Sequence, residues 1–158
     1  MRAALEELGA EFLPDGPNGG YGIRLKFGRS RIYSLERCEG EGGPRIEQLT
    51  VDHSEVQYLV SIGQLTASQA LVHPRRNVIT RALGSREALT VDVAEVPLAS
   101  GDLVLLCSDG LTGELLDEEI RALIDDADTL EDALEKLIGA ALWRGGRDNI
   151  TAVLVRIP

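Results

Sequence analysis

The feature that most constrains the fold is an apolar run that ends in a small polar motif. Residues 103–106 read Leu-Val-Leu-Leu and lead into Cys107-Ser108-Asp109-Gly110-Leu111-Thr112. A short apolar run bounded by turn-forming residues is typical of a strand buried on both faces. Near the C-terminus, residues 145–151 read Gly-Gly-Arg-Asp-Asn-Ile-Thr and precede another β-rich run. The sequence therefore predicts that Asp109 and Asp148 stand at the edges of buried strands, where two carboxylates can share a hard divalent cation.

Length and charge narrow the class of protein. A chain of 158 residues, 44% hydrophobic and 27% charged, fits one globular domain spanning residues 1–158. The net charge of −10 argues against nucleic acid or an anionic membrane as a partner. It is compatible with cation binding and equally with a solvated acidic surface. Cys38 and Cys107 form no CxxC pair, and the chain shows neither a signal peptide nor a membrane-length apolar run, so a cytoplasmic location is expected.

The order of the expected elements indicates an α+β fold with antiparallel sheets, because strands and helices are clustered rather than alternating. Helices are expected at residues 2–12, 55–62 (capped by Ser54), 67–71 (capped by Thr66), 117–124 and 130–142. Strands are expected at 21–26 and 31–35 (as a hairpin), 45–49, 78–80, 88–96, 103–107 and within 149–157. Residues 14–20 are expected to form a turn.

Four segments together resemble a known family. They are 48–54 (QLTVDHS), 73–84 (HPRRNVITRALG), 98–112 (LASGDLVLLCSDGLT) and 145–153 (GGRDNITAV). From Ile46 onward the chain resembles the C-terminal half of the metal-dependent protein Ser/Thr phosphatases of the 2C type, or PPM family, of the bacterial kind. Residues 46–158 are therefore interpreted as family-like, and residues 1–45 as a divergent N-terminal segment.

The resemblance implies a β-sandwich of two antiparallel sheets flanked by helices, with two Mg²⁺ or Mn²⁺ ions at one end. Asp109 would match the aspartate of the family's S-D-G motif, and Asp148 that of its D-N motif, both of them metal ligands. The implied reaction is hydrolysis of phosphoserine or phosphothreonine in a phosphoprotein. In such chemistry the cations lower the pKa of a water molecule and neutralise charge on the phosphoryl group.

The segment from His53 to Gly84 matches the region that carries the family's mobile flap, which makes it a candidate for substrate contact or gating. His53 and His73 are candidates for acid–base groups or, alternatively, for structural and surface roles. Three arginines of this region either hold phosphate or balance the charge of an acidic domain: Arg75, Arg76 and Arg81.

The sequence also departs from the family. Nothing matches the family's opening segment, whose arginine contacts phosphate and whose aspartate–glycine motif supplies the aspartate that bridges both metals. Arg29 stands where the family's G-D-S-R motif has a further metal-binding aspartate, and a guanidinium repels a cation. Asp15, in Pro-Asp-Gly-Pro, is interpreted as turn chemistry and not as a ligand. The sandwich is therefore expected to be incomplete, and metal binding weakened.

Three interpretations remain open on the sequence. The first is a phosphatase domain with full or residual activity. The second is a non-catalytic, degenerate phosphatase that acts as a binding or regulatory module. The third is half of an assembled enzyme, in which exposed sheet edges pair with a second copy or with a complementing chain.

Overall fold

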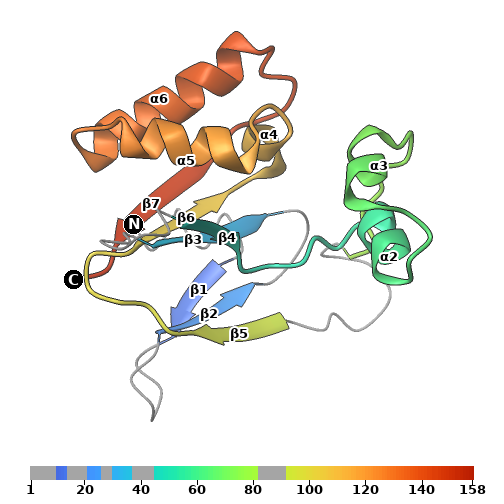
Figure 1. Cartoon of the computed structure of the whole chain (residues 1–158), viewed down its shortest axis with the longest axis horizontal. Helices are drawn as coiled ribbons and strands as arrows, with labels where there is room; N and C mark the ends of the chain where they lie inside the picture. The colour runs from blue at the N-terminus through green and yellow to red at the C-terminus, as the bar shows by residue number, and fades with distance from the viewer. Residues whose placement is uncertain (1–9, 14–20, 26–29, 37–44, 82–91) are drawn as a thin grey trace.

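The computed structural model describes residues 10–13, 21–25, 30–36, 45–81 and 92–158. These residues form two antiparallel sheets, stacked one above the other in Figure 1. Sheet A contains, in spatial order, β1 (Ala10–Leu13), β2 (Tyr21–Leu25) and β5 (Asp92–Val96). Sheet B contains β4 (Arg45–Gln48), β3 (Arg31–Glu36), β6 (Leu103–Cys107) and β7 (Ala152–Arg156). The predicted α+β sandwich is confirmed.

Strand β6 is the centre of the core. All five of its residues are buried, and it lies between β3 and β7 with Leu105 opposite both Tyr33 and Leu154. Because successive side chains of a strand point to opposite faces, β6 contributes to two apolar clusters. Leu103, Leu105 and Cys107 pack toward the helices, whereas Val104 and Leu106 belong to the cluster on the other face of sheet B. The apolar run thus has no polar face because neither of its faces meets solvent.

Helices cover the outer face of sheet B (Figure 1). They are the short α4 (Asp109–Thr112), α5 (Asp117–Asp125) and α6 (Leu130–Trp143). In α6 the residues spaced at i, i+4 and i+8, Ala133, Leu137 and Ala141, are buried in the core cluster. Within the described part of the chain, no helix is long and apolar enough to cross a membrane.

The flap, here residues 54–79, stands beside the sheets rather than on them (Figure 1). It consists of α2 (Glu55–Ser61) and α3 (Ala67–Val72). The predicted caps are confirmed, since Ser54 accepts a hydrogen bond from the Gln57 amide and Thr66 accepts one from the Gln69 amide. The two ends of the flap meet at an isolated antiparallel bridge between Ser54 and Ile79.

The N-terminal prediction was wrong where the structure tests it. Residues 10–12 of the expected helix belong to β1, which pairs with β2 in the register Ala10↔Leu25 to Leu13↔Gly22. A short helix is marginal in water, so the backbone hydrogen bonds offered by a neighbouring strand outweigh a modest helical pattern. The remaining residues of that helix, the predicted turn at 14–20 and Arg29 lie outside the described residues.

The predicted hairpin was wrong in its pairing. Both strands exist, but β2 pairs with β1 and β5 in sheet A, whereas β3 pairs with β4 and β6 in sheet B. Residues 78–80 form no strand beyond the Ser54–Ile79 bridge, and of the strand expected at 88–96 the described part is Asp92–Val96. The other expected strands and helices are confirmed to within one or two residues at their ends, except that the β-rich run expected at 149–157 forms a strand only over Ala152–Arg156.

Candidate functional site

Asp109 is placed by the end of the buried strand. It is the first residue of α4, two positions after β6, and Ser108 between them ties it to the segment that carries Asp148. The Ser108 amide donates to the Thr151 carbonyl over 2.9 Å, the Ser108 hydroxyl donates to the Asn149 carbonyl over 2.9 Å, and that hydroxyl accepts from the Thr151 amide over 3.0 Å. Ser108 therefore fixes one aspartate segment against the other.

Gly110 shows how closely the two segments approach. A Cβ atom added at this position would lie 2.3 Å from the Asn149 carbonyl oxygen, a distance that real Cβ atoms do not reach. The backbone of the S-D-G motif thus packs directly on that of the D-N motif, and only glycine leaves room. Within the D-N motif, the Asp148 carboxylate accepts a hydrogen bond of 2.8 Å from the Asn149 backbone amide.

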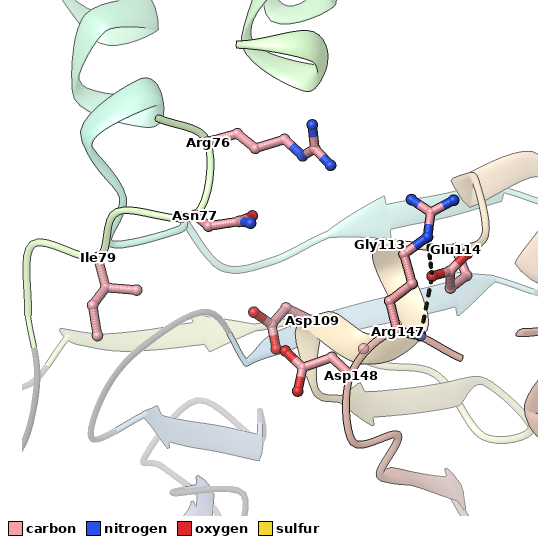
Figure 2. Close-up of a pocket in the computed structure, with 9 residues that line it drawn as sticks. Arg76, Asn77, Ile79, Asp109, Gly113, Glu114, Arg147 and Asp148 are labelled. Carbon is pink, nitrogen blue, oxygen red and sulfur yellow. Dashed lines mark hydrogen bonds and ion pairs between the residues drawn. The ribbon is translucent and has the colours of Figure 1, made fainter. Parts of the chain in front are cut away.

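Both aspartates line one pocket of about 330 Å³, shown in Figure 2. Their carboxylates lie side by side at its floor, and the flap base supplies one wall. The lining residues are Arg76, Asn77, Ile79, Asp109, Gly110, Gly113, Glu114, Arg147 and Asp148. The two residues predicted as metal ligands are therefore brought together, with an arginine of the flap across the pocket from them.

The chemistry of the pocket is set by an oxygen-only donor pair. Glu114 supplies a third carboxylate to the lining, but its 7%-exposed side chain is engaged by Arg147, whose amide donates over 3.4 Å and whose Nε lies 3.7 Å away. Among the residues that the structure describes, no group of three or more His, Cys, Asp or Glu side chains is arranged to hold a metal. Carboxylates are suitable ligands for hard cations, but two of them fill only a few of the coordination positions of such an ion.

The comparisons with known proteins identify the family of this fold. The profile of the family described as Stage II sporulation protein E (SpoIIE) matches residues 65–158. The PPM Ser-Thr phosphatase MsPP of Mycobacterium smegmatis, solved with cacodylate, is 30% identical, with a TM-score of 0.77 over 98% of this chain and 68% of that one. The chain belongs to the PPM family of Ser/Thr phosphatases.

Two further similarities show how much of a PPM protein is represented. Protein phosphatase PhpP of Streptococcus pneumoniae is 43% identical over 133 residues, which are 84% of this chain and 52% of that protein. The catalytic domain of the phosphatase PstP, solved with two manganese ions, is 32% identical, with a TM-score of 0.70 over 93% of this chain and 57% of that one. The chain spans about half the length of the curated relatives it matches, which agrees with the predicted C-terminal portion.

Of the other arginines and histidines predicted as candidates in this PPM chain, one lines the pocket and the others do not. Arg76 lines the pocket, whereas Arg75 pairs with Glu55 over 2.7 Å. Arg81 lies 3.1 Å from Nε2 of His53, and Nδ1 of His73 accepts a hydrogen bond of 3.2 Å from the Arg75 amide. Neither histidine is among the residues that line the pocket. The structure thus singles out one of the three arginines as a phosphate candidate.

Several pocket residues were not predicted individually. Asn77 and Ile79 lie within a segment that carried the PPM resemblance, so the sequence indicated the segment but not which side chains face the pocket. Arg147 directly precedes Asp148, and Glu114 lies five residues after Asp109, beyond the end of α4. Helical periodicity therefore gave no signal for Glu114, because that spacing does not place two residues on one helix face.

Cys107 is excluded as a reactive group despite its position next to the site. Its side chain is fully buried, and burial raises the pKa of the thiol to about 12, with Arg31 acting in the opposite direction. A thiol with such a pKa stays protonated at neutral pH and neither binds a hard cation nor attacks phosphorus. Cys107 is therefore a core residue.

Proposed function

We propose that this chain carries part of the active site of a protein Ser/Thr phosphatase, which hydrolyses phosphoserine and phosphothreonine with Mg²⁺ or Mn²⁺. The observation that supports the proposal is the meeting of Asp109 and Asp148 in one pocket opposite Arg76. A pocket with anionic donors at its floor and a guanidinium at its wall suits a cation bound to a phosphate.

The residues present fit a hard divalent ion. Both donors are carboxylates, and the described residues that line the pocket include neither cysteine nor histidine, which favours Mg²⁺ or Mn²⁺ over softer metals. The neighbouring structure of PstP holds two manganese ions. When bound, such ions supply an activated water and neutralise charge on the phosphoryl group.

The chain's own side chains then have separate tasks. Asp109 and Asp148 hold the cation, and Ser108 keeps their two segments in register. The Arg76 guanidinium offers a fork of donors to phosphoryl oxygens, for which arginine is well suited. Because two carboxylates leave most positions around a cation to water, we expect weak metal binding by this pair alone.

Weak binding by the pair favours a second function. If further carboxylates are needed and are supplied by another chain, this protein acts as half of an assembled enzyme. Without them it acts as a phosphopeptide-binding module that uses the same pocket. Both alternatives keep Arg76 as the phosphate contact and differ in whether turnover occurs.

The test is p-nitrophenyl phosphate hydrolysis across a Mn²⁺ titration, with Asp109→Asn and Asp148→Asn beside the wild type. Glu135→Gln, an exposed acid of α6, is the control for general charge loss. We expect Mn²⁺-dependent turnover that falls by about 100-fold or more in each aspartate variant and stays unchanged in the control. Turnover that survives Asp109→Asn contradicts the assigned site. A folded wild type without turnover that retains a phosphopeptide favours the binding module.

A further inference from the structure

A largely buried charged pair lies at the entry to the flap, and neither of its residues is among those that line the pocket. Arg31, the first residue of β3, contacts Asp52 in the linker between β4 and α2. The guanidinium is bidentate, with Nη2 at 2.7 Å from Oδ2 and Nε at 2.9 Å from Oδ1. The two side chains are 21% and 11% exposed, so the pair is largely removed from water.

The pair belongs to a larger polar network that starts inside sheet B. Arg31 Nη1 also donates to the buried Tyr33 hydroxyl over 3.1 Å, and that hydroxyl donates to Asp117, the first residue of α5, over 3.0 Å. On the other side, the Gln48 amide donates to Asp52 over 3.2 Å. The partners that surround Asp52 are therefore anchored in sheet B or, through Asp117, in a helix that covers it, whereas Asp52 itself lies in the linker.

The electrostatics keep the pair ionised. Burial alone lowers the pKa of Arg31, but the hydrogen bonds and the negative charge of Asp52 outweigh burial and raise that pKa above its ordinary value. Asp52 is thus held by a permanent charge with a fixed fork geometry, which an ammonium group does not reproduce. A bidentate, largely buried pair of this kind fixes the position of the linker segment that contains Asp52.

The linker segment that contains Asp52 leads into the flap. Directly after Asp52, the His53 carbonyl accepts from the Thr80 amide over 2.8 Å, and the Glu55 amide donates to the Val78 carbonyl over 2.9 Å. The returning segment held by these bonds contains the pocket wall. An unbroken series of contacts therefore runs from Arg31 through Asp52 to the residues that face Asp109 and Asp148.

We propose that Arg31 and Asp52 are positioning residues for the pocket wall. They fix the base of the flap against sheet B, and through it the placement of Arg76 relative to the two carboxylates. The anchoring of the flap is independent of catalysis, whereas its consequence for phosphate rests on the proposed function. The pair Arg75–Glu55, in which the Arg75 side chain is 63% exposed and the Glu55 side chain 23%, lies within the flap and provides a more solvated contrast.

The test of the anchor is amide hydrogen exchange on the full chain. We expect Asp52→Asn, which leaves a buried guanidinium without its charge partner, to speed exchange in residues 53–81 by about tenfold or more. Peptides from β6 and α6 should change by less than about twofold, and Glu55→Gln should leave all regions within that limit. Equal acceleration of every region, or none in residues 53–81, overturns the proposal.

Arg31→Lys decides the question if Asp52→Asn does not fold. Lysine keeps the charge but loses the fork, so we expect faster exchange confined to residues 53–81 and smaller than in Asp52→Asn. The second measurement is inorganic phosphate binding in the presence of Mn²⁺. Phosphate affinity should fall several-fold in Arg31→Lys while Mn²⁺ affinity stays within about twofold, and an equal loss of both contradicts the positioning role. A wild type that binds no phosphate contradicts the proposed function, and hydrogen exchange still decides the anchor.

Discussion

The floor and the wall of the pocket are built in different ways. In the floor, Asp109 follows the fully buried strand β6, and the hydrogen bonds of Ser108 tie it to the segment of Asp148 that precedes β7. The wall belongs to a flap whose helices leave large apolar side chains in solvent, with Leu71 62% and Val72 77% exposed. Within α2 and α3, Val56 is the one buried residue.

From this difference we expect the two sides of the site to differ in local stability. Burial of apolar surface is the main source of folding free energy, so the floor is held by the free energy of the whole domain. A segment with few buried apolar contacts opens locally at lower cost. The distance between the carboxylates is therefore set by the global fold, and the position of Arg76 by local contacts at the flap base.

The largest expected change in the free energy of unfolding comes from a leucine-to-alanine substitution in the core, compared with the same kind of substitution in the flap. Leu137→Ala removes a fully buried side chain from the core under the floor and should lower the free energy of unfolding by about 2–5 kcal/mol. Leu71→Ala removes the same atoms from an exposed flap position and should change it by less than about 0.5 kcal/mol. Urea denaturation followed by circular dichroism measures both, and comparable losses would break the distinction between floor and wall.

Gly110 tests the close contact within the floor. Gly110→Ala places a methyl group against the Asn149 carbonyl and should lower the free energy of unfolding by about 1–3 kcal/mol. Gly139→Ala is the matched control, because a Cβ there meets nothing within 4 Å and alanine favours the helix. We expect this control to gain about 0.5–1 kcal/mol in the same urea titration. A neutral Gly110→Ala would show that the two aspartate motifs are less closely packed.

The caps of α6 and α3 stabilise helices on the two sides of the site. Thr129 caps α6, whose buried face belongs to the core, so Thr129→Ala should lower the global free energy of unfolding by about 1 kcal/mol. Thr66 caps α3 through a reciprocal bond with Gln69, and Thr66→Ala should speed amide exchange in α3 without moving the urea midpoint. A shift of the midpoint in Thr66→Ala would mean that the flap unfolds with the core.

The smallest expected effect is a pH dependence at Glu119, on the helix-covered side of the floor. Hydrogen bonds from Arg144, then from the Leu116 amide, lower the pKa of Glu119 from 4.5 to about 2. Because the folded state favours the ionised form, this contribution is complete above the unfolded pKa and is lost as pH falls from about 4.5 through about 2.

Urea titrations of the wild type and Glu119→Gln at about pH 6 and about pH 2.5 check this sign. The difference between the two proteins should be small and should decrease at the lower pH. The control is Glu135→Gln. An increase of the Glu119→Gln difference at low pH would be inconsistent with the lowered pKa.

The sequence predicted best where local signals and burial agree. Strand β6 and helix α6 were found because their apolar spacing matches the surfaces they bury, and the caps Ser54 and Thr66 because capping is local chemistry. The meeting of Asp109 and Asp148 followed from the family's motifs, since no local signal states that two segments so far apart in sequence pack together.

Sheet pairing was beyond the local pattern. The alternation in β2 and β3 predicted two strands correctly, but whether neighbours in sequence pair or enter different sheets depends on which edges other strands occupy. The Arg31–Asp52 pair was missed for a related reason. An arginine at the start of a strand reads as an exposed charge until the register places it beneath the linker to α2.

The bridge between Ser54 and Ile79 has a consequence for engineering. Because it brings the ends of the flap together, the flap behaves as a cassette that enters and leaves the scaffold at one point. A tight turn joining residue 53 to residue 80 would give a protein with the carboxylate floor alone, without pulling neighbouring strands apart. At the same junction, we expect that a flap from another PPM protein could replace this one while the floor stays the same.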